Sequence, residues 1–210
     1  MAVFSTQQVS ALVLAAGRGS RMGGVDKGLQ VFQGRPLVQH AIERLQDQCA
    51  HVMINANRHL DQYAAWGHEV WPDDMADFAG PLAGFMVGLQ HCRTPFLLIV
   101  PCDSPFFPLD LALRLGQALI EQDADLAVAV GAEVDPHGHT VWRPQPVFCL
   151  LRSHLLNSLT RFMQVGGRKI DAWTAQHPCA WARFDQALDD PKAFANFNTL
   201  SELQQHEGRP

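Results

Sequence analysis

The sequence predicts an α/β protein with three layers, α/β/α, around a mostly parallel central sheet. Short apolar runs alternate along the chain with longer segments whose apolar residues recur at helical spacing, and this alternation is typical of a parallel α/β sheet. The most hydrophobic run, at 95–101, has the continuous apolar character of a strand buried on both faces. No repeat, linker or charge run divides the 210 residues, so we expect one domain over 1–210.

The individual elements follow in chain order. Apolar runs bounded by turn residues predict strands at 9–16, 51–55, 69–71, 95–101, 125–130, 146–151 and 179–184. Apolar residues at three- and four-residue spacing predict helices at 36–48, 60–66, 81–92, 108–122, 153–164 and 201–206. Pro36 suits a first helical turn. We expect Ser153 to be an N-cap, and Thr199 or Ser201 to cap the last helix.

Composition excludes several classes of protein. The chain is 47% hydrophobic and 18% charged, which is typical of a globular domain. A net charge of −5 gives no basic footprint, so we expect no nucleic-acid partner. No apolar run approaches the roughly 20 residues of a membrane span, so no membrane association is expected. Five cysteines without a C-x-x-C pair fit a reducing cytosol, and we expect a cytoplasmic protein.

The run at 12–28 is the strongest functional signal in the chain. An apolar strand enters a loop that carries Arg21 and Lys27 and has glycines at 17, 19, 23 and 24. Glycine lets the backbone approach a ligand closely, and successive N–H groups form a concavity that binds anions. The loop is neither a P-loop, because Gly28 follows Lys27, nor a dinucleotide fingerprint, because Met22 takes the place of the third glycine. The pattern favours a phosphate-binding loop over a plain glycine-rich turn.

Polar residues also follow other predicted strands. Asn55, Asp73 and Asp103 each come at the end of an apolar run, and ligands of open α/β sheets bind at that edge. Asp103 is the best candidate for a Mg²⁺ ligand; the alternative is a turn or N-cap aspartate. Arg21 and Lys27 suit phosphate oxygens, unless they are solvated loop cations.

Several motifs, in order over residues 12–199, resemble those of nucleotidyltransferases and in detail those of the molybdenum cofactor guanylyltransferases. They are Leu14-Ala15-Ala16-Gly17-x-Gly19-Ser20-Arg21-Met22-Gly23 with Asp26-Lys27-Gly28-Leu29, Ile54-Asn55-Ala56-Asn57-Arg58, Gly80-Pro81-Leu82-Ala83-Gly84, Pro101-Cys102-Asp103-Ser104-Pro105 and Asn196-x-Asn198-Thr199. The resemblance implies transfer of GMP from GTP to molybdopterin bearing molybdenum, with release of pyrophosphate. It also implies the Rossmann-like, glycosyltransferase-A-like fold of nucleotidyltransferases.

The resemblance further implies roles for single residues. Arg21, Lys27 and Asp103 are the expected catalytic groups, with Mg²⁺ on Asp103. Nucleotide contacts are implied for Leu14, Ala15, Ala16, Gly17, Gly19, Arg21, Lys27, Asn55, Asp73 and Asp103. Contacts to the pterin are expected from Arg168, Lys169, Asn196 and Asn198. Residues 9–110 would form the nucleotide-binding half and 111–210 the acceptor-binding half.

Two alternatives remain open from the sequence. Ala15-Ala16-Gly17 stands where many guanylyltransferases have Ala-Gly-Gly, and it is closer to the cytidylyltransferases, so CTP or another acceptor such as a sugar phosphate is one alternative. The other is a carrier that hands finished cofactor to acceptor molybdoenzymes or their chaperones. Trp173 and Trp181 would then form an exposed docking patch, unless both belong to the core.

Overall fold

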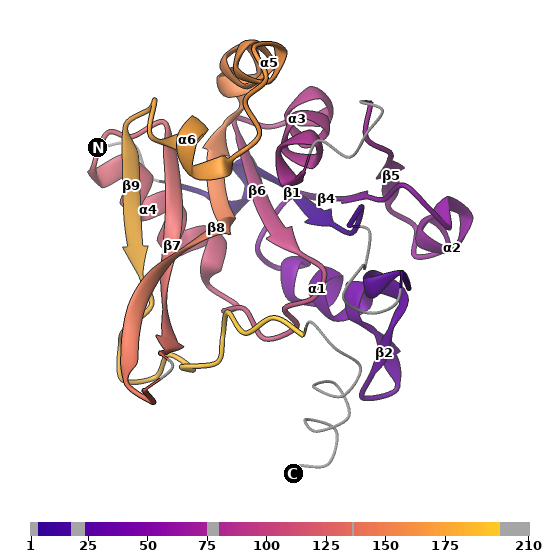
Figure 1. Ribbon diagram of the computed structural model, residues 1–210, viewed down its shortest axis with the longest axis horizontal. Helices are drawn as coiled ribbons and strands as arrows, with labels where there is room; N and C mark the ends of the chain where they lie inside the picture. The colour runs from indigo at the N-terminus through magenta and orange to yellow at the C-terminus, as the bar shows by residue number, and fades with distance from the viewer. Residues whose placement is uncertain (1–3, 18–23, 75–79, 136, 198–210) are drawn as a thin grey trace.

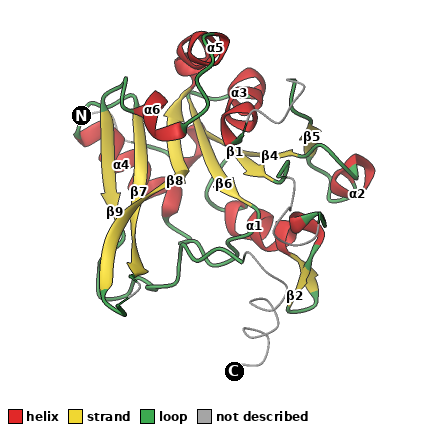
Figure 2. Ribbon diagram, in the orientation of Figure 1, coloured by secondary structure: helices red, strands yellow, loops and turns green. Residues whose placement is uncertain are grey.

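The structure, a computed structural model, describes residues 4–17, 24–74, 80–135 and 137–197. Figure 1 shows one central sheet whose strands lie side by side across the molecule, with helices in front of it and behind it. The strands at 9–14, 51–55, 69–71 and 96–101 run parallel to one another, so that the loops that follow them lie along one edge of this sheet (Figure 2).

The apolar runs of the sequence form the strands, and the amphipathic segments form the helices. The strands are β1 (Val9–Leu14), β2 (Val31–Phe32), β3 (Arg35–Pro36), β4 (His51–Asn55), β5 (Glu69–Trp71), β6 (Phe96–Pro101), β7 (Leu126–Val134), β8 (Thr140–Arg152) and β9 (Cys179–Arg183). The helices are α1 (Leu37–Leu45), α2 (Leu60–Ala64), α3 (Pro81–His91), α4 (Leu111–Glu121), α5 (Leu156–Gln164) and α6 (Ile170–Thr174), with 3₁₀ turns η1 (Thr6–Gln8), η3 (Lys27–Leu29) and η4 (Ser153–Leu155). Within the described ranges, no helix is both long enough and apolar enough to cross a membrane.

Strand order brings the ends of four parallel strands together. The described sheet runs β5-β4-β1-β6-β8-β7-β9. β1 pairs in parallel with β4 and β6, and β4 pairs in parallel with β5. β8 is antiparallel to both β6 and β7, while β9 is parallel to β7. The predicted mostly parallel sheet is confirmed, and the carboxyl ends of β1, β4, β5 and β6 share one edge.

Successive side chains of the sheet point into two different core layers, as the pleat requires. Leu98 and Val100 of β6 pack in one cluster with α1 and α4, while Leu97 and Ile99 pack in another with α3, α5 and α6. All four side chains are fully buried. Helices therefore cover both faces of the sheet (Figure 1), and the predicted three-layer arrangement is confirmed.

Most predicted elements form close to their expected positions. The strands expected at 51–55 and 69–71 coincide with β4 and β5. The prediction that Ser153 is an N-cap was wrong, because Ser153 begins η4 and the N-cap position of α5 is Leu155, which makes no side-chain cap bond. Ser153 instead donates its backbone N–H to the carbonyl of Pro95 (2.9 Å). The helix expected at 201–206 lies outside the described residues.

β8 begins well before the strand expected at 146–151 and passes through Pro144 and Pro146. Proline has no backbone N–H to donate to a neighbouring strand, so it is disfavoured where a strand is paired on both sides. β6 pairs only with Cys149 to Arg152, so the prolines lie where β8 follows β7 alone. The register with β7 also shifts after Val128, from Cys149 to Gln145, which is a bulge that releases intervening residues from the ladder.

The small hairpin β2–β3 and helix α6 were not predicted. Gln33 and Gly34 connect the hairpin with φ values of 48° and 77°, as a two-residue type I′ turn requires. Gly34 was the available signal for this turn, but the two-residue strands were too short to show alternation. Helix α6 has five residues, which is too short for a helical period to be recognised.

We expect the centre of β6 to carry much of the stability of the fold. Replacing Leu98, which is fully buried, by alanine should lower the free energy of unfolding by about 2–5 kcal/mol, because a cavity remains in the core. Leu188→Ala is the matched control, since Leu188 is 99% exposed and its loss should change stability by at most about 0.5 kcal/mol. Urea unfolding followed by circular dichroism measures both, and equal effects of the two substitutions would contradict the assignment of β6 to the core.

Candidate active site

The loops at the strand ends are tied to one another by backbone hydrogen bonds. The N–H of Ala15 donates to the carbonyl of Asn55 (2.8 Å), and the N–H of Cys102 donates to the carbonyl of Leu14 (3.1 Å). The N–H of Ala56 likewise donates to Trp71 (3.1 Å). The sheet ladder thus continues one residue past β1, β4 and β6, so that the first residues of each loop have fixed positions.

Lys27 and Asp103 meet at this edge. Lys27 Nζ lies 2.9 Å from Asp103 Oδ2, and the two side chains are 20% and 15% exposed. Lys27 begins η3, while Asp103 follows the end of β6 by two residues. Each charge is compensated by the other and is still reached by solvent. The pair can therefore open toward a charged ligand without leaving a buried, unpaired ion.

Asn55 holds Asp73 in place. Asn55 is 1% exposed, and its Nδ2 donates to the carbonyl of Trp71 (3.1 Å) and to Asp73 Oδ1 (3.0 Å). Asn57 Nδ2 donates to the other carboxylate oxygen of Asp73 (2.7 Å), and the Asp73 N–H donates to Asn57 Oδ1 (2.8 Å). The two asparagines of the Asn-Ala-Asn stretch thereby fix the Asp73 carboxylate at the end of β5.

Helix α3 approaches this edge very closely at Gly84. A Cβ atom added there would lie 2.5 Å from Leu14 Cδ2 and 2.6 Å from Asn55 Oδ1. Such separations are shorter than side chains tolerate, so a larger residue would push α3 away from β1 and β4. The last glycine of the Gly80-Pro81-Leu82-Ala83-Gly84 motif is therefore required for packing behind Leu14 and Asn55.

The end of the described chain crosses the loop that carries Asp103. The N–H of Phe197 donates to the carbonyl of Asp103 (2.9 Å), and Ser104 Oγ donates to Asn196 Oδ1. The Phe197 ring packs on Phe32 at 5.1 Å between centroids and on Phe106 at 5.8 Å. The structure thus brings Asn196 next to the Asp103 loop.

Cys102 directly precedes Asp103, and its backbone N–H donates to the carbonyl of Leu14. Its side chain nevertheless belongs to the core. Its side chain is buried, and burial, followed by the nearby carboxylates of Asp103 and Asp26, raises the pKa of its thiol well above the usual value. A thiol of this kind remains protonated at neutral pH and does not act as a nucleophile or a metal ligand.

Arg168 and Lys169 lie at the start of α6. Arg168 Nη1 donates to the carbonyls of Met163 (2.9 Å) and Gly167 (2.7 Å), so part of its guanidinium closes the turn after α5. A Cβ on Gly80 would lie 3.9 Å from the carbonyl oxygen of Arg168. This separation places the turn beside the N-terminus of α3, the helix whose Gly84 packs against Asn55.

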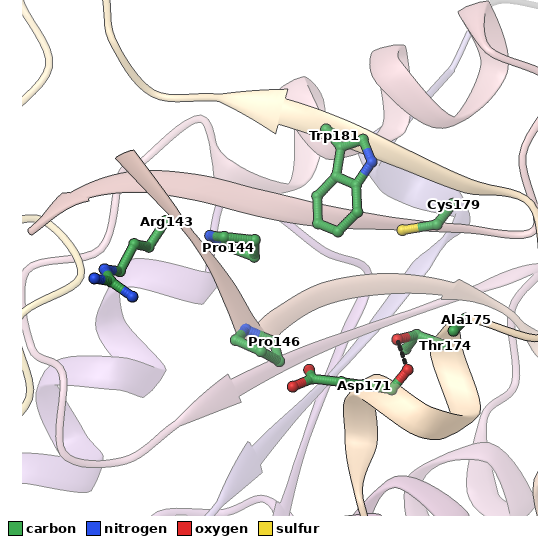
Figure 3. Close-up of a pocket in the computed structure, with 8 residues that line it drawn as sticks. All are labelled: Arg143, Pro144, Pro146, Asp171, Thr174, Ala175, Cys179 and Trp181. Carbon is green, nitrogen blue, oxygen red and sulfur yellow. Dashed lines mark hydrogen bonds between the residues drawn. The ribbon is translucent and has the colours of Figure 1, made fainter. Parts of the chain in front are cut away.

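A cavity of about 330 Å³ lies between α6 and the strands β8 and β9 (Figure 3). Its lining residues come from β8, α6 and β9: Arg143, Pro144, Pro146, Asp171, Thr174, Ala175, Cys179 and Trp181. Trp181 is 49% exposed. Trp173 is fully buried and donates its Nε1 to Ser158 Oγ (3.3 Å), so the suggested exposed patch of two tryptophans was wrong for Trp173.

The structure therefore gathers most of the predicted residues at one sheet edge. Those described there are Leu14, Ala15, Ala16, Gly17, Lys27, Asn55, Asp73, Asp103 and Asn196. Gly19, Arg21 and Asn198 lie outside the described residues. Sequence reasoning gave no role to Asn57 or Ser104, although both stand in the quoted motifs; polar residues directly after a strand end were the signal for them.

The described residues fit one mode of cation binding. They contain no cluster of three or more His, Cys, Asp or Glu side chains that would form an all-protein metal site. At the sheet edge, Asp103 provides a carboxylate that lies next to the Lys27 ammonium group and is partly exposed to solvent. A single carboxylate suits Mg²⁺, which commonly binds through one or two carboxylates together with substrate phosphates and water.

Comparison with solved structures confirms the fold. The chain superposes on molybdopterin-guanine dinucleotide biosynthesis protein A of Archaeoglobus fulgidus with a TM-score of 0.70, at 18% identity over 94% of this chain and 96% of the other. It superposes on 4-diphosphocytidyl-2C-methyl-D-erythritolsynthase of Anaerococcus prevotii with a TM-score of 0.71, at 9% identity over 96% and 95%. The expected nucleotidyltransferase fold is present.

Family comparison defines the class of protein. A model described as the MobA-like NTP transferase domain matches residues 11–180, so the chain belongs to this family of nucleotidyltransferases. It is 59% identical to the molybdenum cofactor guanylyltransferase of Acidovorax sp. (strain JS42) over 207 residues, 98% of each chain. It is 55% identical to that of Ralstonia nicotianae over 200 residues, 95% and 96%. Within the family its sequence groups with the molybdenum cofactor guanylyltransferases, whose motifs it resembles.

The protonated, buried state of Cys102 can be tested by alkylation. Iodoacetamide at pH 8 should modify Cys102 at least about a hundredfold more slowly in the native protein than in the unfolded chain, because only the exposed thiolate reacts. Between pH 7 and 9 this rate should keep rising by about tenfold per pH unit without levelling off, because the thiolate fraction grows with pH until the pKa is reached and the pKa of Cys102 is raised well above the usual value. Partly exposed Cys92 is the internal control. Mass spectrometry measures both sites, and rapid native labelling of Cys102 would contradict a core role.

Proposed function

We propose that the protein transfers GMP from GTP to molybdopterin bearing molybdenum, forming the guanine dinucleotide cofactor and pyrophosphate. The observation that carries the proposal is 59% identity over 98% of the chain to a molybdenum cofactor guanylyltransferase. The Lys27–Asp103 pair at the sheet edge supplies charges suited to a triphosphate. The same relatives favour GTP over CTP, although Ala16 takes the place of a glycine in the loop.

The reaction needs positioning and charge compensation more than a protein nucleophile. An oxygen of the acceptor's terminal phosphate attacks the α-phosphorus of GTP. The bond from the α-phosphorus to the bridging oxygen breaks, and pyrophosphate leaves with the electron pair. Lys27 turns from Asp103 toward the phosphate oxygens, where an ammonium group stabilises the charge that develops on the leaving group. Arg21 would add a second cation that can hold two oxygens at once.

Asp103 would hold Mg²⁺ together with the phosphate oxygens of GTP. The bound ion compensates charge on the triphosphate and on the leaving group. Releasing Lys27 and engaging a cation keeps the Asp103 carboxylate paired in both states. This exchange explains why a lysine and an aspartate that face each other can serve one ligand.

The nucleotide would lie along the edge formed by β1, β4 and β5. The backbone of Leu14 to Gly17, with Gly19, would line the nucleotide. Asp73 is the group best placed for the ribose or base, because Asn55 and Asn57 already engage the carboxylate and hold it at the end of β5. Asn55 then acts mainly by orienting Asp73.

The acceptor would bind in the second half, over 111–210, while 9–110 holds the nucleotide. Arg168 and Lys169 suit the negative groups of molybdopterin, and Asn196 with Asn198 would close the site beside Asp103. The five cysteines are free thiols, as in a reducing compartment, so we propose that the reaction takes place in the cytoplasm. Acceptor molybdoenzymes or their chaperones would then receive the product.

Pyrophosphate release by the purified protein tests the function. With Mg²⁺ and molybdopterin, GTP should give stoichiometric pyrophosphate and the guanine dinucleotide, while CTP should give neither. Omission of molybdopterin is the control for simple GTP hydrolysis. Release with CTP alone would move the protein to cytidylyl transfer, and binding of the finished cofactor without any release would favour a carrier.

Asp103→Ala should abolish transfer while the fold stays intact. The substitution removes the carboxylate proposed for Mg²⁺ and leaves Lys27 without that partner, so kcat should fall by about 10³-fold or more. Asp110→Ala is the matched control, because Asp110 is 52% exposed and makes only a 3.7 Å contact with Arg114. Pyrophosphate release and circular dichroism are measured for both. Full activity of Asp103→Ala would rule out the metal assignment.

A further inference from the structure

The segment after β4 contacts both described ends of the glycine loop. Arg58 Nη1 donates to the carbonyl of Gly24 (2.8 Å), and Arg58 Nη2 contacts the carbonyl of Gly17 (3.4 Å). These two glycines flank residues 18–23 in the sequence. A guanidinium is a planar fork whose N–H groups reach two acceptors at a fixed separation. The Arg58 side chain therefore sets the distance between Gly17, which follows β1, and Gly24, which precedes Lys27.

Asp26 is anchored to the same segment. It stands at the N-cap position of η3, yet its side chain makes no cap hydrogen bond. Its carboxylate accepts from Tyr63 Oη (2.5 Å) and from His59 Nδ1 (3.1 Å). The side chain is 5% exposed, and a carboxylate this buried needs partners of this kind. Asp26 is thus held by α2 and not by its own helix.

The next two residues depend on this anchor. Lys27 points to Asp103. Gly28 lies so close to Tyr63 that an added Cβ atom would overlap the Tyr63 hydroxyl. Tyr63 is fully buried. The Asp26-Lys27-Gly28 motif is therefore held on both sides of Lys27, by a hydrogen bond to Tyr63 before it and by contact with the Tyr63 ring after it.

His59 adopts a conformation that suits this arrangement. Its φ of 51° and ψ of 38° are left-handed, which is uncommon for a residue other than glycine. The turn at His59 lets Arg58 reach toward Gly17 and Gly24 while the ring of His59 faces Asp26. A strained backbone conformation of this sort persists where surrounding contacts fix it, and such positions often cluster at functional sites.

We propose that Tyr63 and Arg58 are positioning residues for GTP. This inference rests on the proposed function and deepens it. Tyr63 acts through Asp26 to hold Lys27 at the triphosphate, and Arg58 fixes the backbone at Gly17 and Gly24. Both act through other residues, so they set the affinity for GTP and the orientation of its phosphates, while the acceptor site in 111–210 is independent of them.

Tyr63→Phe removes one hydroxyl and keeps the ring. The dissociation constant and KM for GTP should rise about tenfold, because Asp26 loses a charge-assisted hydrogen bond and Lys27 loses its support. KM for molybdopterin should not change. A merely structural role would lower the fraction of active molecules without altering GTP affinity, so titration calorimetry that reports both stoichiometry and affinity separates the two. Trp66→Phe, in the turn after α2 and against the Tyr63 ring, is the control for altered packing.

Arg58→Lys keeps the charge and removes the fork. If Arg58 fixes the two carbonyls, Arg58→Lys should weaken GTP binding nearly as much as Arg58→Ala, by about tenfold. If it only attracts phosphate, Arg58→Lys should bind GTP like the wild type, and that result would overturn its assignment. Arg93→Lys is the matched control, since Arg93 is exposed, pairs with Glu69 and precedes β6 at the opposite edge of the sheet.

The two hypotheses fail in different ways. Wild-type transfer together with unchanged GTP affinity in Tyr63→Phe and Arg58→Lys would overturn the positioning role and leave the proposed function standing. If the wild type transfers no GMP to molybdopterin while both variants bind GTP more weakly, the proposal that molybdopterin is the acceptor is overturned. The positioning role of Tyr63 and Arg58 is then supported.

Discussion

The ion pair between Lys27 and Asp103 is the interaction on which the arrangement of this site depends. The two residues are 76 positions apart: Asp103 follows β6, and Lys27 begins η3, whose neighbouring residues Asp26 and Gly28 pack against Tyr63 of α2. An ion pair that is fully buried is costly to break, while one that is fully exposed is weakly held. At 20% and 15% exposure, this pair lies between those limits. It keeps two charges in place until a ligand offers each a different partner.

The glycines of the motifs serve two separate purposes around this pair. The sequence signature suggests that glycine is present so that the backbone can approach phosphate. Gly28 and Gly84 have another role, since a Cβ at either position would overlap Tyr63 or the side chains of Leu14 and Asn55. They allow η3 and α3 to pack against the residues that form the site. The glycines of these motifs therefore allow helices to pack closely against the site residues, as well as allowing a ligand to approach the backbone.

Sequence reasoning predicted the features that depend on local pattern. Apolar runs gave the strands of the sheet, and polar residues after them, such as Asn55 and Asp103, fell at one edge because parallel strands end together. The orientation of β8 and its path through Pro144 and Pro146 were not predictable, since they depend on which strands lie beside it. The three-layer arrangement followed from the alternation of apolar runs with helical segments, and the family followed from the order of the motifs.

Contacts between distant side chains were beyond the sequence. Nothing in the spacing of Asp26 and Tyr63, 37 residues apart, indicates that one receives a hydrogen bond from the other. Trp173 illustrates the same limit, because a tryptophan in a polar stretch can face solvent or the core. Its burial follows from α6, a helix of five residues that periodicity does not reveal. Where a side chain is fixed by the packing of several elements, pattern alone identifies the residue and not its partner.

The strand order also bears on how the protein is made. During synthesis the amino-terminal half emerges first, but a domain generally folds as a unit. β1 pairs with Phe96 to Pro101 of β6, and β6 in turn pairs with Cys149 to Arg152 of β8. A nascent chain that stops before these residues leaves its central strand with an open edge, which is prone to association with other chains. The sheet edge that carries the Lys27–Asp103 pair therefore gains its full strand pairing only late in translation.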